Sequence, residues 1–230
     1  MNNNYTSTIS DSTIYLTPKN KAIASIIWLH GLGANANDLT CLPHELNLQE
    51  NLNIRHIFPN APIRQVTFAE GMAMNAWFDI VDLSLESPQD EQGILEANNI
   101  LEKIIENEIQ SGIESNKIIL AGFSQGGAMA LYSGLRYRKT LGAILALSSF
   151  MPLSNKLPKE KSIQNEATPI LMTHGIHDPL IPLNISKHFH SYLTSLNYKV
   201  KLNIYNMAHE ICPEEIADIS QWITDLLSVR

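Results

Sequence analysis

The amino-acid sequence predicts an α/β protein in which a mostly parallel central sheet is flanked by helices on both faces. Two observations lead to this fold class. Short aliphatic runs recur along the chain, and longer segments with helical periodicity separate them. Strands that alternate with helices usually pair in parallel, because each helix carries the chain back across the sheet. With 230 residues and 44% hydrophobic content, the chain is expected to form one domain over residues 1–230.

Seven segments are expected to be strands. Each is a short run rich in aliphatic or β-branched residues, and together they span residues 12–16, 24–30, 53–58, 117–122, 141–149, 169–175 and 199–205. The run at 117–122 reads KIILAG and is typical of a fully buried strand. The stretch between residues 149 and 169 is too short for a separate lid domain.

Four segments have the composition or periodicity of helices. The clearest begins after Asp90, which we expect to be its N-cap. Apolar residues recur in it every three or four positions, at Ile94, Ala97, Leu101, Ile104 or Ile105, and Ile109. The other helices are expected at 125–138, 184–196 and 213–227, the last with Pro213 near its first turn. The apolar face of the first helix should therefore lie on the sheet.

The charge and composition of the chain exclude several functions. A net charge of −7 and a pI near 5.6 argue against binding to nucleic acid or to an anionic membrane surface. The first residues lack the basic and apolar segments of a signal peptide, and no apolar stretch is long enough to span a bilayer. We therefore expect a cytoplasmic protein. Cys41 and Cys212 are too few and too far apart to suggest a disulfide framework.

A glycine-rich turn is the strongest local signal. Gly122, Ser124 and Gly126 fit the pattern G-x-S-x-G between the strand at 117–122 and the helix that follows it. The glycines lack the Cβ atoms that would block close approach of strand and helix, so the turn can lift the serine Oγ out of the sheet. The alternative is a glycine-rich turn whose serine merely caps the helix.

A serine nucleophile needs a base, and usually a carboxylate that orients the base. In sheets with this turn, the chain order is serine, then acid, then histidine. Asp178 follows the strand at 169–175, and His209 follows the strand at 199–205. Both loops should lie at the carboxyl edge of the sheet, where sites in open α/β sheets gather. Taken singly, Asp178 could be a turn residue before Pro179, and His209 a histidine beside a helix.

Other candidates for the acid and the base fit less well. They either precede the serine, lie in a predicted helix or, for one histidine, adjoin the proposed acid: His44, His56, Asp79, Asp82, His188, His190 and His177. A metal site built from His174, His177 and Asp178 is a further alternative, but no additional ligand motif accompanies it. No metal is therefore expected.

The developing oxyanion needs backbone donors. One is expected from Gln125, the residue after the serine, and one from the loop after an early strand. Gly31 and Gly33 give that loop the freedom to direct the N–H of Leu32. As a phosphate-binding loop the same segment is incomplete, because it lacks both the full glycine pattern and a following Lys-Ser or Lys-Thr.

Six segments spread over nearly the whole chain are WLHGLGAN (28–35), FPNAP (58–62), AWFDI (76–80), GFSQGGAMAL (122–131), HGIHDPLIP (174–182) and MAHEICPEEI (207–216). In this order they resemble the acyl-protein thioesterase and carboxylesterase family of α/β-hydrolases, which includes lysophospholipase-type esterases. The resemblance implies an α/β-hydrolase fold, a Ser124, Asp178 and His209 triad, and an oxyanion hole from Leu32 and Gln125. It also implies a cytosolic esterase without a cofactor and, often, a homodimer.

The segment from 63 to 87 is rich in large apolar residues without clear periodicity, namely Phe68, Met72, Met74, Trp77, Phe78 and Leu83. They could be core residues under a long loop. The alternative is an adaptable groove for an acyl chain, since methionine and aromatic surfaces suit flexible hydrocarbon. The resemblance at AWFDI favours a substrate-binding role for Phe68, Met72, Met74, Trp77 and Phe78.

These observations predict a serine hydrolase that cleaves carboxylic esters or thioesters with an apolar acyl chain through an acyl-enzyme. The expected substrate is a small-molecule or lipid ester, or an acylated protein, without nucleic-acid binding or integral membrane association. A catalytically inactive hydrolase fold that binds a ligand or a partner is the alternative.

Overall fold

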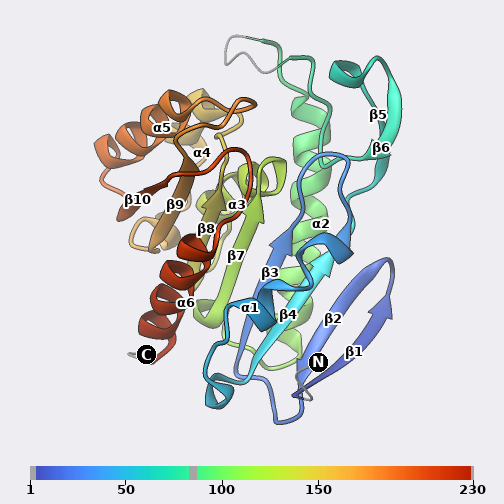
Figure 1. Cartoon of the computed structure of the whole chain (residues 1–230), viewed down its shortest axis with the longest axis vertical. Helices are drawn as coiled ribbons and strands as arrows, with labels where there is room; N and C mark the ends of the chain where they lie inside the picture. Colours follow the sequence, from blue (N-terminus) through green and yellow to red (C-terminus); the bar gives the residue numbers. More distant parts are fainter. Residues whose placement is uncertain (1–3, 83–86, 229–230) are drawn as a thin grey trace.

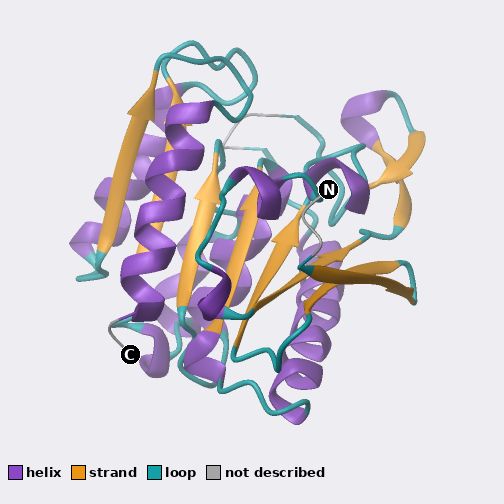
Figure 2. Ribbon diagram, turned by 60° about the horizontal axis from the view of Figure 1, so that its bottom comes forward, coloured by secondary structure: helices purple, strands orange, loops and turns teal. Residues whose placement is uncertain are grey.

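The centre of the computed structural model, which describes residues 4–82 and 87–228, is an 8-stranded sheet with the order β1-β2-β4-β3-β7-β8-β9-β10 (Figures 1 and 2). Five neighbouring pairs are parallel, from β4 across to β10. The edge pairs of this sheet, β1–β2 and β2–β4, are antiparallel. The strands are β1 (Tyr5–Ser10), β2 (Thr13–Pro18), β3 (Ala24–Leu29), β4 (Ile54–Pro59), β7 (Ile118–Phe123), β8 (Ala143–Leu147), β9 (Ile170–Gly175) and β10 (Val200–Tyr205). The predicted mostly parallel sheet is confirmed.

Helices cover both faces of the sheet (Figure 1). On one face lie α2 (Glu91–Gln110), α3 (Gln125–Arg136), the short α4 (Leu157–Glu160) and α5 (Leu183–Ser195). On the other lie α6 (Pro213–Ser228) and the short α1 (Leu42–Glu45). Asp90 caps α2 as predicted, because its Oδ1 accepts a hydrogen bond from the N–H of Gly93 (2.9 Å). In the described part of the chain, no helix is long and apolar enough to cross a membrane.

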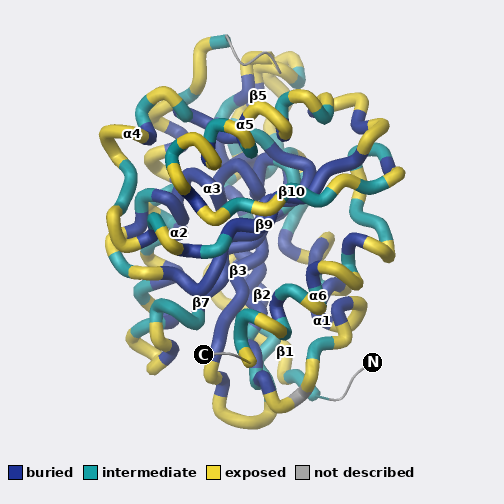
Figure 3. Tube along the Cα trace, turned by 90° about the vertical axis from the view of Figure 1, so that its left-hand side faces the viewer, coloured by how far each residue is buried: buried dark blue, intermediate teal, exposed yellow. Residues whose placement is uncertain are grey.

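The central strands are buried on both faces (Figure 3). Along β3, Ile26 and Trp28 belong to the core on the face of α1 and α6, whereas Ile27 and Leu29 belong to the core on the face of α2 and α3. Side chains of a strand alternate between the two faces of its sheet, so one short run contributes to both cores. This explains why such a strand reads as continuously apolar in the sequence.

Besides the short helices α1 and α4, two strand-containing parts of the fold are absent from the sequence prediction. One is β1, an exposed edge strand. The other is the hairpin of β5 (Ile63–Val66) and β6 (Met72–Asn75), which lies in the segment expected to be a long loop. Leu83 lies outside the described residues. Between β8 and β9, the chain forms only α4 and short turns of 3₁₀ helix.

Candidate active site

Ser124 occupies a strained turn between β7 and α3. Its φ of 55° and ψ of −119° lie in a region that residues with a side chain rarely adopt. A Cβ atom on Gly122 would lie 2.3 Å from the carbonyl carbon of Gly126, and one on Gly126 would lie 2.0 Å from the oxygen of Leu29. Only glycine therefore allows α3 to begin this close to β3 and β7. Ser124 stands at the N-cap position but makes no side-chain cap, so its hydroxyl is not used to hold the helix.

Asp178 and His209 meet at the ends of adjacent strands. The Oδ2 of Asp178 lies 2.7 Å from the Nδ1 of His209, and the side chain of Asp178 is fully buried. Its other oxygen accepts the backbone N–H groups of Leu180 (2.9 Å) and Ile181 (2.8 Å). Since an ionised carboxylate only accepts hydrogen bonds, the Nδ1 of His209 is the donor. The opposite ring nitrogen, Nε2, is then an acceptor and is available to take a proton.

The two other histidines near Asp178 have different partners. The Nε2 of His174 lies 2.7 Å from the carbonyl oxygen of Ile181 and 3.4 Å from the Oδ2 of Asp178. Burial lowers the pKa of His174, which favours a neutral ring that donates to Ile181. His177 is exposed, and its Nε2 lies 2.9 Å from the Oδ1 of Asn206. Within residues 4–82 and 87–228, no group of three or more His, Cys, Asp or Glu side chains could hold a metal ion.

A cleft of about 540 Å³ brings Ser124, His209, Leu32 and Gln125 to one surface. Asp178 does not line it but lies buried behind His209. The walls are largely apolar and come from several loops, with Leu39, Leu42, Phe68, Ile80, Phe123, Phe150, Leu180, Ile181, Ile211 and Ile216 among the lining residues. A much narrower pocket of about 50 Å³ shares Ile80, Phe150, Leu180 and Ile181 with the cleft and extends to Phe78 and Ile185. The serine therefore lies beside a continuous apolar surface.

The residues predicted to form the groove lie in three different places in the structure. Phe68 lines the cleft, and Phe78 lines the narrow pocket. Met72 and Met74 line neither, and Met72 is 64% exposed on β6. Trp77 is fully buried and belongs to the core, which corrects its assignment to the groove.

Sequence reasoning overlooked most of the cleft wall. Leu39, Leu42 and Ile211 lie in or beside the loops that follow β3 and β10. Leu180 and Ile181 follow Asp178 in the loop after β9. Loops at the carboxyl ends of parallel strands commonly form binding sites. That rule could have identified these residues, because each follows a strand whose position was predicted.

The loop that carries Leu32 is held by hydrogen bonds within the loop and to Ala61 and Asn75. The Nε2 of His30 accepts the N–H of Ala61 (3.0 Å), so Nδ1 carries the ring proton and donates to the oxygen of Gly31 (2.8 Å). Burial lowers the pKa of His30, which keeps the ring neutral. Gly33 donates its N–H to the oxygen of Asn75 (2.9 Å). The loop around Leu32 is therefore fixed before substrate arrives.

Gln125 is the first residue of α3. The first N–H groups of a helix have no partner within the helix, and the helix dipole makes this end favourable for negative charge. Gln125 directly follows Ser124 in the chain, so its backbone N–H lies at this end of α3, and both residues line the cleft. A fold of this kind, with a strained serine turn, a buried acid and an oriented histidine around one cleft, defines the α/β-hydrolase class of serine hydrolases.

Comparison with known proteins specifies the class further. Residues 12–227 match the sequence profile of the phospholipase/carboxylesterase family. Acyl-protein thioesterase 1 of Neurospora crassa is 36% identical over 213 residues, which cover 89% of this chain and 87% of the relative. Acyl-protein thioesterase 1 of Cryptococcus neoformans is 33% identical over 230 residues, which cover 92% of this chain and 96% of the relative. The chain therefore belongs to the phospholipase/carboxylesterase family and is a hydrolase of the carboxylesterase and thioesterase type.

Solved structures agree with this assignment. Arabidopsis thaliana SOBER1 superposes with a TM-score of 0.85 at 31% identity, covering 89% of this chain and 99% of SOBER1. Zea mays acyl-protein thioesterase 2 superposes with a TM-score of 0.84 at 29% identity, covering 94% of this chain and 98% of the maize protein. The similarity extends over nearly the full length of each structure.

Proposed function

We propose that the enzyme hydrolyses carboxylic esters and thioesters with an apolar acyl chain, using Ser124, His209 and Asp178 as a catalytic triad. The hydrogen bond of 2.7 Å between Asp178 and His209 carries this proposal. It fixes the tautomer in which the Nε2 of His209 can accept a proton, and His209 and Ser124 line the same cleft. A serine hydroxyl is a weak nucleophile near neutral pH and requires such a base.

In the first half of the reaction, the Oγ of Ser124 attacks the carbonyl carbon while His209 takes the hydroxyl proton. The carbonyl oxygen becomes an oxyanion, which the N–H groups of Leu32 and Gln125 stabilise. As the tetrahedral intermediate collapses, the bond to the alcohol or thiol breaks, and His209 returns its proton to the leaving group. An acyl-Ser124 ester remains.

In the second half, water replaces the leaving group. His209 takes one proton from water, and the resulting hydroxide attacks the acyl carbon in the same oxyanion hole. The bond to Ser124 then breaks, its Oγ regains a proton from His209, and the carboxylic acid leaves. Asp178 stays ionised throughout and stabilises the protonated ring of His209. No cofactor takes part in this scheme.

The apolar cleft favours fatty acyl substrates. Leu180, Phe150 and Ile80 line both the cleft and the narrow pocket and offer hydrocarbon an apolar surface. Relatives that bear the name acyl-protein thioesterase support a fatty acyl thioester on a protein cysteine as the leading substrate. The cytoplasmic location and the homodimer remain predictions, which cell fractionation and sedimentation would test.

Active-site labelling tests the proposed function against the inactive-fold alternative. A fluorophosphonate should react with the wild-type protein at Ser124 and abolish its esterase and thioesterase activity, whereas Ser124→Ala should neither label nor turn over. Activity should withstand a metal chelator. A folded Ser124→Ala variant with a tenth of the wild-type kcat would refute the nucleophile, and a wild-type protein without labelling or turnover would support a binding protein.

A further inference from the structure

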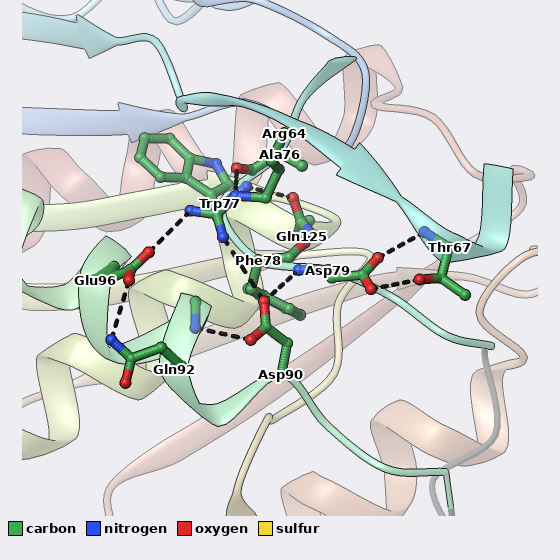
Figure 4. Close-up of polar contacts among 11 residues, drawn as sticks. Arg64, Thr67, Ala76, Trp77, Phe78, Asp79, Asp90, Gln92, Glu96 and Gln125 are labelled. Carbon is green, nitrogen blue, oxygen red and sulfur yellow. Dashed lines mark hydrogen bonds and ion pairs between the residues drawn. The ribbon is translucent and has the colours of Figure 1, made fainter. Parts of the chain in front are cut away.

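The side chain of Gln125 clamps the backbone of the segment 77–78 (Figure 4). Its Oε1 accepts the N–H of Trp77 (2.9 Å), and its Nε2 donates to the oxygen of Phe78 (2.8 Å). Gln125 is only 1% exposed, so both bonds lie in a dry environment. There the loss of either partner would leave a buried polar group unpaired. The residue that offers one oxyanion donor through its backbone is thus held by its side chain.

Trp77 also reaches the second oxyanion loop. Its indole Nε1 donates to the carbonyl oxygen of His30 (2.9 Å), two residues before Leu32. The two rings lie 5.4 Å apart between centroids, and Trp77 is fully buried. One residue therefore contacts both donor-bearing segments, the N-terminus of α3 through its backbone N–H toward Gln125 and the loop after β3 through its indole N–H toward His30.

The segment that carries Trp77 is itself anchored on both sides (Figure 4). Upstream, the Nε of Arg64 donates to the oxygen of Ala76 (2.9 Å). Downstream, the N–H of Asp79 donates to the Oδ2 of Asp90, the N-cap of α2 (2.8 Å). Because neighbouring elements hold both ends of this segment, Trp77 cannot adjust freely to a change in the loop of Leu32 or at the N-terminus of α3.

We propose that Trp77 is a positioning residue that sets the relative placement of the two oxyanion donors, the N–H groups of Leu32 and Gln125. The inference rests on the proposed function. Stabilisation of an oxyanion depends on donors that are in place before charge develops. Small displacements of such groups reduce the rate strongly, whereas binding of the acyl chain elsewhere in the cleft is unaffected. The role differs from that of a groove wall, because it acts on the transition state alone.

Trp77→Phe removes the indole N–H and keeps an aromatic ring. We expect kcat to fall by about 10- to 100-fold, which is less than the 10² to 10³ expected for outright loss of a donor. KM should stay nearly constant, and the loss should be the same for acetyl and octanoyl esters. The affinity for a trifluoromethyl ketone, whose carbonyl carbon is attacked by Ser124 to give an oxyanion adduct, should fall by the same factor as kcat/KM.

Trp28→Phe is the matched control. Trp28 is also buried, at 1% exposure, and its indole N–H also donates to a buried partner, the Nδ1 of His56 (3.0 Å). It packs on the opposite face of the sheet from Trp77. This variant should lose thermal stability, yet its kcat and its affinity for the ketone should stay at wild-type levels. A loss of kcat equal to that of Trp77→Phe would refute the proposal.

A second variant keeps the shape of the side chain. Replacing Trp77 with benzothienylalanine, in which sulfur takes the place of the indole N–H, should reproduce the loss of kcat and of ketone affinity. It also carries the test if Trp77→Phe does not fold. An unchanged kcat, or a loss that grows with acyl length through KM, would overturn the proposal. Ser124→Ala tests the proposed function separately. If that variant loses turnover while the Trp77 variants behave like wild type, the positioning role fails and the proposed function stands.

Discussion

Asp178 and His209 are 31 positions apart in the chain, yet their side chains lie 2.7 Å apart because they follow adjacent parallel strands. In the register of β9 and β10, Gly175 pairs with Tyr205 at the edge where both strands end. The acid and the base then continue from that edge in neighbouring loops. The pairing of two strands thus determines the geometry of the proposed base.

Asp178→Asn should lower kcat by about 10⁴ while the protein stays folded. The amide can still accept the N–H groups of Leu180 and Ile181 through its oxygen. It would then turn its NH₂ group toward His209 and favour the tautomer with the proton on the wrong nitrogen. Steady-state kinetics together with circular dichroism would measure this. A near-normal kcat would mean that another residue orients the base.

His209→Ala and His177→Ala form a matched pair, because both side chains lie in loops at the same edge of the sheet. The first removes the proposed base and should lower kcat by up to about 10⁶. The second removes a ring that contacts Asn206 and does not line the cleft, so kcat should stay close to wild type. Single-turnover assays with an activated ester would measure both. A large loss in His177→Ala would show that the base is misassigned.

The sequence predicts those parts of the molecule whose residues must satisfy a strong local constraint. The strands β3, β7 and β9 are buried on both faces and read as apolar runs. Ser124 lies in a turn that only flanking glycines permit, and this leaves a recognisable pattern. The order of serine, acid and histidine along the chain then follows from the order of the strands.

The parts of the structure that the sequence does not predict depend on packing between distant segments. β1 carries five exposed residues out of six, so no hydrophobic pattern reveals it. Trp77 and Phe68 belong to one aromatic-rich segment, but the first is in the core and the second lines the cleft. Composition cannot separate these two places, since both are apolar. Trp77 is distinguished by its hydrogen bonds to His30 and Gln125, which join it to residues distant in the sequence.

Phe150→Ala should lower kcat/KM more for long acyl chains than for short ones. Phe150 lines both the cleft and the narrow pocket, so a chain that enters either one contacts it. Burial of a methylene group is worth about 0.8 kcal/mol, or up to roughly fourfold per carbon, and the variant should lose part of that gain. A series of p-nitrophenyl esters from acetyl to decanoyl would measure it, with Phe150→Leu as the conservative control. A uniform loss across the series would mean that Phe150 does not contact the acyl chain.

Glu215→Gln should stabilise the protein at pH 8 more than at pH 5. Glu215 is buried in the first turn of α6, where neither carboxyl oxygen has a hydrogen-bond partner among the described residues, and burial raises the pKa of its carboxyl to about 7. Because the native pKa exceeds the ordinary value of 4.5, the folded state binds the proton more tightly than the unfolded state. The contribution of Glu215 to stability is therefore complete below pH 4.5 and is lost as the pH rises through about 7.

A shift of this size corresponds to at most about 3 kcal/mol between the two ends of that range. Glutamine has no charge to bury, so the free energy of unfolding of the variant relative to that of the wild type should increase from pH 5 to pH 8. Urea unfolding at pH 5 and pH 8 would measure the difference. Glu214→Gln is the matched control, since Glu214 is the exposed neighbour on the same turn and its carboxyl stays in water. Equal effects of Glu215→Gln at both pH values, or the same pH dependence in Glu214→Gln, would show that Glu215 is not the titrating group.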